Sequence, residues 1–385
     1  MTLIEPSWDR AREAAFNLGT LGGLGEVEKL PLSQIVDRHL AVDALALVQL
    51  PTYETSAMDG YVVAGNGPWN IVGEVKAGVP FQGMLEDGDA LGIATGAVIP
   101  DGAYGVIRWE NANVNDNQLT GETSARKDFR PAGEEAKLNE VLVANGSKLT
   151  PAMVGLIAAA GYDEIEVYKL PRVALLLLGD EIQLKGIPSN GLVRDSLGPQ
   201  LPGWIEKLGC RVEYIEYVQD NLDLTVEAIK SATEKYDLVI TTGGTADGPR
   251  DFLKIAVEKL GGKLRVDKVA VRPGHPQVLA EVNETPVIGL PGNPQSAVVA
   301  LMTLAAPLIS AIFGREISDL PEISTVDNFQ AQPGFTRLVL GTLSNGQFKM
   351  GEYLGSAMLR SLAHADGFAV CTNPTTSLRW LGLPA

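Results

Sequence analysis

The feature that most constrains the fold is a repeated order of apolar strand, loop and amphipathic helix that begins at Pro171. The run from Val173 to Leu178 is continuously aliphatic, as a parallel strand covered on both faces requires. Further strands are predicted at 212–218, 238–241 and 286–289, helices at 201–208, 224–235 and 252–260, and a long apolar helix after Pro294. This alternation is typical of a doubly wound α/β domain, which gathers its ligands at the carboxyl ends of its strands.

Residues 51–135 have a different texture, with many glycines, short apolar runs such as 61–63, 70–75 and 105–109, and Asp-Gly turns. That density of strand and turn signals predicts a small β domain or barrel. Helical patterning flanks it. Trp8, Ala11, Ala15 and Leu18 recur at three to four residues, as do the apolar positions from Ile35 to Leu47, and residues 148–162 form a helix that Thr150 caps.

After Gly314 the pattern becomes β again, with strands predicted at 336–341 and 367–371. We therefore predict an α/β multidomain protein with four parts. They are a helical linker domain (1–50 and 136–170), an inserted β domain (51–135), a doubly wound α/β domain (171–315) and a C-terminal β domain (316–385).

The net charge of −16 opposes non-specific binding to nucleic acid or to an anionic membrane, so an anionic ligand must be held by local groups. Cys210 and Cys371 are too few for a disulfide framework and favour a reducing, cytoplasmic location. No secretory signal is expected at the N-terminus. The apolar stretch 297–313 is short for a membrane span and contains Pro307, which favours a buried helix over membrane insertion.

The strongest chemical feature is the segment from Leu238 to Asp251, in which a buried strand breaks into a glycine-rich turn ahead of a helix. Glycine lets the backbone approach an anion, and the N–H groups of the turn and of the helix N-terminus present positive dipole ends. Thr242, Gly243 and Gly244 are therefore predicted to bind a phosphate-bearing substrate; an ordinary tight turn is the alternative.

A second such loop, in the segment 287–297, follows another strand. Its predicted contacts are Pro291, Gly292, Asn293 and Pro294, with Asn293 as the N-cap and Pro294 as the first helical residue. Between the two loops, the stiff segment Arg272-Pro-Gly-His-Pro276 presents a guanidinium and an imidazole that could clamp an oxyanion.

Carboxylates cluster at the same predicted strand ends: Asp180, Glu181, Asp195, Asp220 and Asp251. Acidic side chains beside an anion repel it unless a hard cation lies between them, so Mg²⁺ is implied. For each acid alone, a helix cap or a solvated loop position is an equally good interpretation.

Five segments in order along the chain resemble the motifs of the MoeA family and of the matching domain of gephyrin. They are Ser56-Ala-Met-Asp-Gly-Tyr61, Ile93-Ala-Thr-Gly-Ala97, Arg130-Pro-Ala-Gly-Glu-Glu135, Leu178-Gly-Asp-Glu181 and the Gly-Leu-Pro-Gly-Asn-Pro-Gln-Ser-Ala segment at 289–297.

The resemblance implies a molybdopterin-binding α/β domain and a molybdopterin molybdenumtransferase. Such an enzyme inserts molybdate into adenylylated molybdopterin and releases AMP. The resemblance also implies an elongated homodimer whose active site combines the α/β domain of one subunit with the β module of the other.

Carried over by motif, the catalytic and magnesium-organising residues are Asp59, Thr95, Glu181, Asp220 and Asp251, with Glu181, Asp220 and Asp251 as the metal ligands. Asp195 and Ser196 fall in a substrate-binding segment. Arg272 and His275 stand where the family has two molybdate-binding lysines, and Ser296, Arg337 and Ser356 are further oxyanion contacts.

Two other functions stay open. One is a catalytically weakened, gephyrin-like scaffold that binds a peptide at its C-terminal β domain, or that binds other proteins of molybdenum cofactor biosynthesis. The other is a molybdopterin adenylyltransferase, because the loop 243–251 resembles the G-G-T-G and P-R-D pattern of that enzyme. The adenylyltransferase is a lone α/β domain, so the Ser56–Tyr61 module favours the MoeA assignment.

Overall fold

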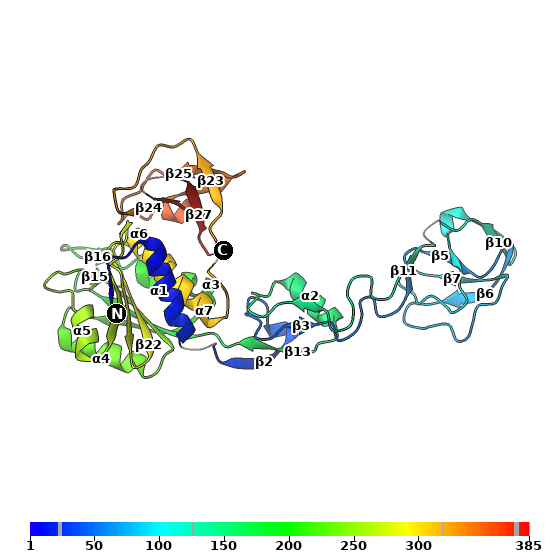
Figure 1. Cartoon of the computed structure of the whole chain (residues 1–385), viewed down its shortest axis with the longest axis horizontal. Helices are drawn as coiled ribbons and strands as arrows, with labels where there is room; N and C mark the ends of the chain where they lie inside the picture. The colour runs from blue at the N-terminus through cyan, green and yellow to red at the C-terminus, as the bar shows by residue number, and fades with distance from the viewer. Residues whose placement is uncertain (22–24, 125–126, 318, 373–376, 385) are drawn as a thin grey trace. The chain divides into compact units, whose positions relative to one another are not determined.

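The computed structural model describes residues 1–21, 25–124, 127–317, 319–372 and 377–384. The chain divides into two compact units (Figure 1). Unit 1 comprises residues 1–28, 37–41 and 168–385, and unit 2 comprises residues 29–36 and 42–167. In sequence, most of unit 2 is therefore an insertion in unit 1.

Unit 1 is built on a seven-stranded sheet with the strand order β1-β19-β21-β22-β18-β14-β17. Its strands are β1 (Leu3–Ile4), β14 (Arg172–Leu178), β17 (Arg211–Val218), β18 (Leu238–Thr242), β19 (Lys263–Asp267), β21 (Val278–Val282) and β22 (Thr285–Leu290). Strands β17, β14, β18 and β22 are parallel, whereas β21 is antiparallel to both of its neighbours. The predicted doubly wound core is confirmed, and β19 and β21 add an antiparallel extension that the sequence pattern did not indicate.

Helices cover both faces of this sheet (Figure 1). They are α1 (Trp8–Leu21), α3 (Leu197–Lys207), α4 (Leu222–Thr233), α5 (Leu253–Lys259), α6 (Pro294–Ala300) and α7 (Ala306–Ile312), with a π-helical turn at Leu301–Ala305. Val173, Leu175 and Leu177 of β14 pack in one core cluster with residues of α1, α3, α6 and α7. The alternate residues of β14 pack in a second cluster with α4 and α5. Burial on both faces explains why β14 is continuously aliphatic.

The N-terminal helix α1 forms as predicted, but it belongs to unit 1 rather than to a helical linker domain. Trp8, Ala11 and Ala15 are fully buried in the α/β core, and the Trp8 indole N–H donates to the Thr303 hydroxyl at 2.9 Å. The spacing of the apolar residues predicted the helix, but it could not say which distant segment the helix covers.

The helix suggested by the spacing from Ile35 to Leu47 is wrong. A short strand, β2 (Val27–Pro31), leads into a 3₁₀ turn (Leu32–Gln34), and Asp37 has a φ of +65°. Ile35, Leu40, Ala44 and Ala46 are nevertheless buried, so the apolar spacing reflects burial on an irregular backbone.

One continuous helical segment, Pro294–Ile312, is long and apolar enough to cross a membrane, but 83% of its most apolar window is buried within the protein. Its apolar character is therefore explained by its place in the core of unit 1, as expected from the sequence.

The C-terminal part of unit 1 is a six-stranded sheet with the order β20-β24-β25-β23-β27-β26, which an added β24–β26 pairing closes on itself. Its strands are β20 (Val271–Arg272), β23 (Glu322–Thr325), β24 (Thr336–Ser344), β25 (Gln347–Met350), β26 (Gly367–Cys371) and β27 (Leu378–Gly382). The short strand β20 joins the α/β part of unit 1 to this sheet by pairing parallel with β24.

Unit 2 contains a six-stranded sheet in the order β8-β5-β7-β6-β10-β9. The strands are β5 (Gly60–Val63), β6 (Trp69–Val75), β7 (Asp89–Ile93), β8 (Gly105–Arg108), β9 (Ala112–Asn115) and β10 (Gln118–Gly121). Helix α2 (Pro151–Ala159) also lies in unit 2, and the Thr150 hydroxyl caps it by accepting the Met153 N–H at 3.2 Å. The inserted β module and its following helix are thus confirmed as elements.

Candidate functional site

Three loops meet at the carboxyl ends of the neighbouring strands β14, β18 and β22. The Gly243 N–H, after β18, donates to the Leu290 carbonyl at the end of β22 at 2.8 Å. Gly243 has a φ of +79°, and a Cβ atom at this position would lie 2.7 Å from the Leu178 carbonyl oxygen of β14. Only glycine fits such a left-handed, closely approached position, so the loops interlock through it.

The glycine-rich loop 243–251 is held by two carboxylates. Asp251 Oδ2 accepts the Gly248 N–H at 2.7 Å and so closes the last turn of the loop. Asp247 forms ion pairs with Lys254 of α5 and with Lys268 after β19. Hydrogen bonds from Lys254 and Lys268 lower the pKa of the Asp247 carboxyl to about 2. The loop is therefore anchored from both sides, and its backbone N–H groups can be presented to a ligand.

The acids at the ends of β14 and β17 lie together. The Asp220 N–H donates to Asp180 Oδ1 at 3.1 Å, and the Asp180 N–H donates to Asp220 Oδ2 at 3.4 Å. Burial, followed by the negative charges of Asp180, Asp220 and Glu181, raises the pKa of the Tyr217 hydroxyl.

The three predicted metal ligands do not form a preassembled metal site. Across the described part of the chain, no group of three or more acidic, histidine or cysteine side chains is placed to hold a metal ion. Asp251 already accepts a backbone hydrogen bond, whereas Asp180 is the acid that approaches Asp220. Oxygen donors of this kind still fit Mg²⁺, which takes one or two protein carboxylates and completes its shell with substrate phosphates.

Asp195 has a structural role in this conformation. Its Oδ1 atom accepts the N–H groups of Leu197 and Gly198 at 3.0 and 2.9 Å, so it caps helix α3. Ser196 occupies the formal N-cap position but makes no capping hydrogen bond with its side chain. The helix-cap interpretation of Asp195 is thus supported.

The second loop leads directly into helix α6. Asn293 is its N-cap residue and Pro294 its first residue, as predicted, although the Asn293 side chain makes no capping bond. Sequence reasoning missed the next residue, Gln295. Its backbone N–H donates to the Ser356 carbonyl at 2.9 Å, and its buried side-chain amide donates to the carbonyls of Tyr353 and Met358. A polar residue at the start of an apolar helix was the available signal.

A pocket of about 370 Å³ lies where β20, the second loop and the C-terminal sheet meet. All five oxyanion contacts predicted from the sequence line it, together with Pro291 and Asn293 of the second loop. These five residues are Arg272, His275, Ser296, Arg337 and Ser356. Leu338, Leu340 and Leu354 form its apolar wall. Residues spread over more than eighty positions of the sequence are therefore brought into one cavity.

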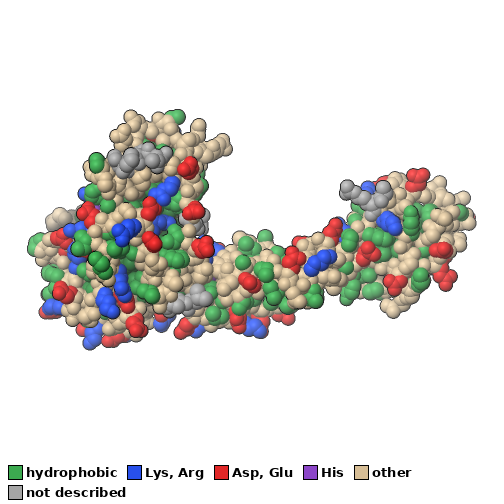
Figure 2. All heavy atoms as spheres, viewed as in Figure 1, with side chains coloured by type: hydrophobic (Ala, Val, Ile, Leu, Met, Phe, Trp, Pro, Cys, Tyr) green, Lys and Arg blue, Asp and Glu red, His purple; other side chains and the backbone are tan. Residues whose placement is uncertain are grey.

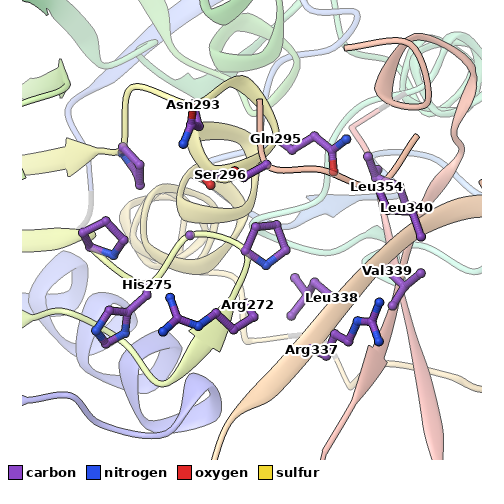
Figure 3. A pocket seen from close by; sticks show the side chains of 15 residues that line it. Arg272, His275, Asn293, Gln295, Ser296, Arg337, Leu338, Val339, Leu340 and Leu354 are labelled. Atoms are coloured by element: carbon purple, nitrogen blue, oxygen red, sulfur yellow. The ribbon is translucent and has the colours of Figure 1, made fainter. Parts of the chain in front are cut away.

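Strand pairing places Arg272 of β20 directly opposite Arg337 of β24. Figure 3 shows the Arg272 guanidinium extending toward the imidazole of His275, while the Arg337 side chain extends the other way. Arg337 Nη1 donates to the Gln330 carbonyl at 3.2 Å. The ring of Phe335 contacts both Arg272, at 5.0 Å from its centroid, and His275, at 5.7 Å between centroids. Phe335 thus supports both groups of the turn.

The charged residues that line this pocket in the described structure are Arg272, Arg337 and the titratable His275; its lining contains no carboxylate. This local excess of positive charge contrasts with the net charge of −16. On the face drawn in Figure 2, acidic and basic side chains are interspersed over the surface. The pocket therefore has the electrostatic character of a site for a small anion.

The remaining two predicted catalytic residues, Asp59 and Thr95, lie in unit 2. Asp59 Oδ1 accepts the Thr95 N–H at 2.7 Å, and both side chains are exposed. Their proximity was not derivable from spacing, because they are separated by 36 residues and belong to different segments of the β module.

These features define an α/β protein with two loops at the carboxyl ends of neighbouring strands and an adjoining pocket lined by Arg272, His275 and Arg337. Comparison with known families gives the same class. Residues 6–161 match the family described as the MoeA N-terminal region (domain I and II), and residues 174–311 match a probable molybdopterin binding domain.

The molybdopterin molybdenumtransferase of Haemophilus influenzae is 33% identical over 300 residues, which cover 76% of this chain and 74% of that protein. The Bacillus subtilis protein of the same name is 29% identical over 374 residues, which cover 91% of this chain and 87% of that protein. The crystal structure of the molybdopterin biosynthesis moeA protein from Pyrococcus horikoshii OT3 has a TM-score of 0.81 at 20% identity, covering 98% of this chain and 97% of that one, and shows the shared fold. The chain belongs to the MoeA family of molybdopterin molybdenumtransferases.

Proposed function

We propose that this protein inserts molybdate into the dithiolene of adenylylated molybdopterin and releases AMP. The observation that carries the proposal is the pocket that Arg272, His275 and Arg337 line beside the loop that follows β22. Relatives at 28–33% identity that are named molybdopterin molybdenumtransferase support this activity.

The pocket supplies what a tetrahedral oxyanion needs. Guanidinium groups and hydroxyls donate hydrogen bonds, and those that involve a charged partner are the strong ones. The volume of about 370 Å³ is several times the roughly 30 Å³ that one water molecule occupies in the liquid, so part of a larger substrate fits beside the anion. Leu338, Leu340 and Leu354 offer this substrate an apolar wall.

The loop 243–251 supplies the phosphate-binding part of the site. Its glycines leave the backbone open to a phosphate, and Asp247 and Asp251 hold its conformation from within. Backbone N–H donors bind a phosphate without adding positive side chains. Because Gly243 contacts the end of β22, a substrate held on this loop is next to the second loop, which lines the oxyanion pocket.

We also propose that Mg²⁺ assists the reaction. Asp220 and Glu181, with Asp180 beside Asp220, would hold the ion together with phosphate oxygens of the substrate. When bound, Mg²⁺ neutralises negative charge that develops at the phosphate. Asp251 orients the loop that would bind the phosphate, and it lies close in sequence to the backbone N–H groups that would donate to the phosphate.

Asp59 and Thr95 of unit 2 are proposed to act in the same reaction, which requires a unit 2 to reach the site on unit 1. A homodimer, as the family resemblance implies, would supply unit 2 from the partner subunit.

We further propose that the enzyme acts in the cytoplasm. Both cysteines are free and buried, and burial raises the pKa of the Cys210 thiol.

Identification of the nucleotide product tests the proposal. Purified protein is incubated with Mg²⁺, molybdate and adenylylated molybdopterin, and separately with Mg²⁺, ATP and molybdopterin. AMP in the first reaction is the expected result. Pyrophosphate in the second, without AMP in the first, would identify an adenylyltransferase. If neither product forms while a relative releases AMP under the same conditions, the scaffold function gains support and our proposal fails.

A further inference from the structure

His275 is held by its own turn in a way that fixes which ring nitrogen carries a proton. Nδ1 lies 2.8 Å from the Val269 carbonyl oxygen, and the Val269 N–H donates to the His275 carbonyl at 3.0 Å. A carbonyl oxygen only accepts hydrogen bonds, so Nδ1 must be the donor. Nε2 is then the nitrogen left for a ligand, and in the neutral ring it carries a lone pair.

The charges around the imidazole come from four segments. Glu5 follows strand β1, and its Oε1 atom lies 3.7 Å from Nδ1 of His275. Arg272 of β20 and Arg337 of β24 line the same pocket. Lys268 and Asp267, next to Val269, form ion pairs with Asp247 and Lys254 respectively. Arg272 therefore extends toward the ring in the pocket, Arg337 extends away from it, and the Glu5 carboxylate lies on the Nδ1 side.

We propose that His275 contacts the oxyanion only as an imidazolium cation, so that binding of a tetrahedral dianion is coupled to uptake of one proton at Nε2. The inference rests on the proposed function, because it takes the pocket to be the molybdate site. The proton comes from solvent, and no other bond is formed or broken.

The direction of the coupling follows from the charges. A neutral Nε2 would turn its lone pair toward an oxygen of the anion, and the contact would be repulsive. A bound dianion brings two negative charges into the pocket and so favours the protonated ring.

Because binding takes up a proton, affinity falls as pH rises. The limit is about tenfold per pH unit for uptake of one proton. A lysine at this position, as in the family pattern, stays charged at neutral pH and would give no such dependence. Arg272 likewise contributes at every pH.

The experiment is calorimetric titration of the purified protein with molybdate alone, between pH 6.5 and 8.5, in buffers that differ in their enthalpy of ionisation. The expected result is an apparent enthalpy that varies with the buffer, corresponding to uptake approaching one proton at the upper end of the range. The affinity should fall three- to tenfold per pH unit.

Two variants separate the role of Nε2 from that of the turn. His275→Lys supplies a permanent charge, so uptake should vanish and binding at pH 8.5 should exceed that of the wild type. His275→Asn keeps an N–H donor near the Val269 carbonyl but has nothing in place of Nε2, so binding should be weak and independent of pH.

A wild-type affinity that does not change with pH, or proton uptake that persists in His275→Asn, would overturn the inference. In that case, AMP release in the product assay would still support the proposed function. Coupled molybdate binding without AMP release would instead support the inference and contradict the proposed function. Absence of molybdate binding at every pH would contradict both the inference and the proposed function.

Discussion

Arg272 and Arg337 are register partners on the paired strands β20 and β24, and their side chains extend in opposite directions while lining one pocket (Figure 3). Nothing in the lining of their pocket neutralises them, since its described residues include no carboxylate. Phe335 stacks against Arg272, and Gln330 accepts from Arg337, but neither offsets the charge. A bound anion does, which is the residue-scale reason to regard this pair as functional.

Asp251 is the acid whose role is most sharply testable. The substitution Asp251→Asn keeps an oxygen that can accept the Gly248 N–H, so the loop should stay folded, but it removes the negative charge. We expect turnover to fall at least a hundredfold, measured as AMP release, with the oligomeric state unchanged in gel filtration. Unchanged activity would exclude Asp251 from catalysis; equal loss in Asp251→Asn and Asp251→Ala would point to its charge rather than its hydrogen bond.

Residue types at strand ends were readable from the sequence, but their pairing was not. The pattern predicted carboxylates near one edge of the sheet, and Asp180, Asp220 and Glu181 do lie there. It could not indicate that Asp195 would turn onto the N-terminus of α3, because a loop acid is equally suited to a cap and to a ligand. Arg337 and Ser356 were found only by resemblance, since no local pattern connects them with Arg272.

At the scale of elements, the interlocking of three strand ends depends on Gly243. A methyl group at this position would meet the Leu178 carbonyl oxygen, and its φ of +79° is strained for any other residue. Gly243→Ala should therefore lower the free energy of unfolding by about 1–3 kcal/mol, measured by urea denaturation, and weaken binding of AMP-bearing ligands.

Gly292→Ala is the matched control in the neighbouring loop. The nearest atom to a Cβ there is the Gly243 Cα at 4.0 Å, and Gly292 has no positive φ. Its effect on stability should stay within about 0.5 kcal/mol. Equal destabilisation by the two substitutions would mean that close approach at Gly243 does not hold the loops together.

The anchoring of loop 243–251 should depend on pH. Hydrogen bonds from Lys254 and Lys268 lower the pKa of Asp247 in the folded protein to about 2, below its ordinary value of 3.8. A depressed carboxyl pKa contributes stability above the unfolded-state value and loses it as pH falls toward the folded one.

The stability difference between wild type and Asp247→Asn, from urea unfolding, should thus be constant above about pH 5 and shrink as pH falls from about 4 toward 2. High salt should reduce it where Asp247 is ionised, because the Asp247 carboxylate is exposed. A difference that grows on acidification would contradict this assignment.

The elements that the sequence predicted best were those with a long, regular pattern. Strand β14 and helix α4 occur close to their predicted bounds because burial on two faces or on one stripe leaves a clear periodicity. The segment from Ile35 to Leu47 failed because buried residues on an irregular backbone imitate helical spacing. Strands β19 and β21 were missed because no helix separates them from each other or from β22, so the alternation of strand and helix gave no signal for them.

At the scale of the whole molecule, the proposed chemistry is divided between two compact units. The oxyanion pocket lies wholly in unit 1, whereas Asp59 and Thr95 lie in unit 2. Binding of the anion and turnover should therefore be separable. The four-domain division stays a prediction; helix α1, which that division placed in the helical linker domain, lies in unit 1.

Asp59→Asn tests this separation. It should reduce AMP release at least tenfold, because Asp59 is proposed to act in the reaction, while calorimetry should give an unchanged affinity for molybdate. Glu86→Gln removes an exposed carboxylate from the same unit and should change neither quantity. A parallel loss of molybdate affinity in Asp59→Asn would show that the two functions are not divided between the units.

The central claim is that the Arg272 pocket is the molybdate site of an AMP-releasing enzyme. The most direct measurement is the initial rate of AMP release from adenylylated molybdopterin as a function of molybdate concentration, for the wild type and for Arg272→Met, which keeps an apolar side chain beside Phe335. The wild-type rate should rise with molybdate and saturate. Arg272→Met should need about ten- to a hundredfold more molybdate, as loss of a charged hydrogen-bonding group predicts. A rate that does not respond to molybdate, or one that responds identically in the variant, would contradict the account.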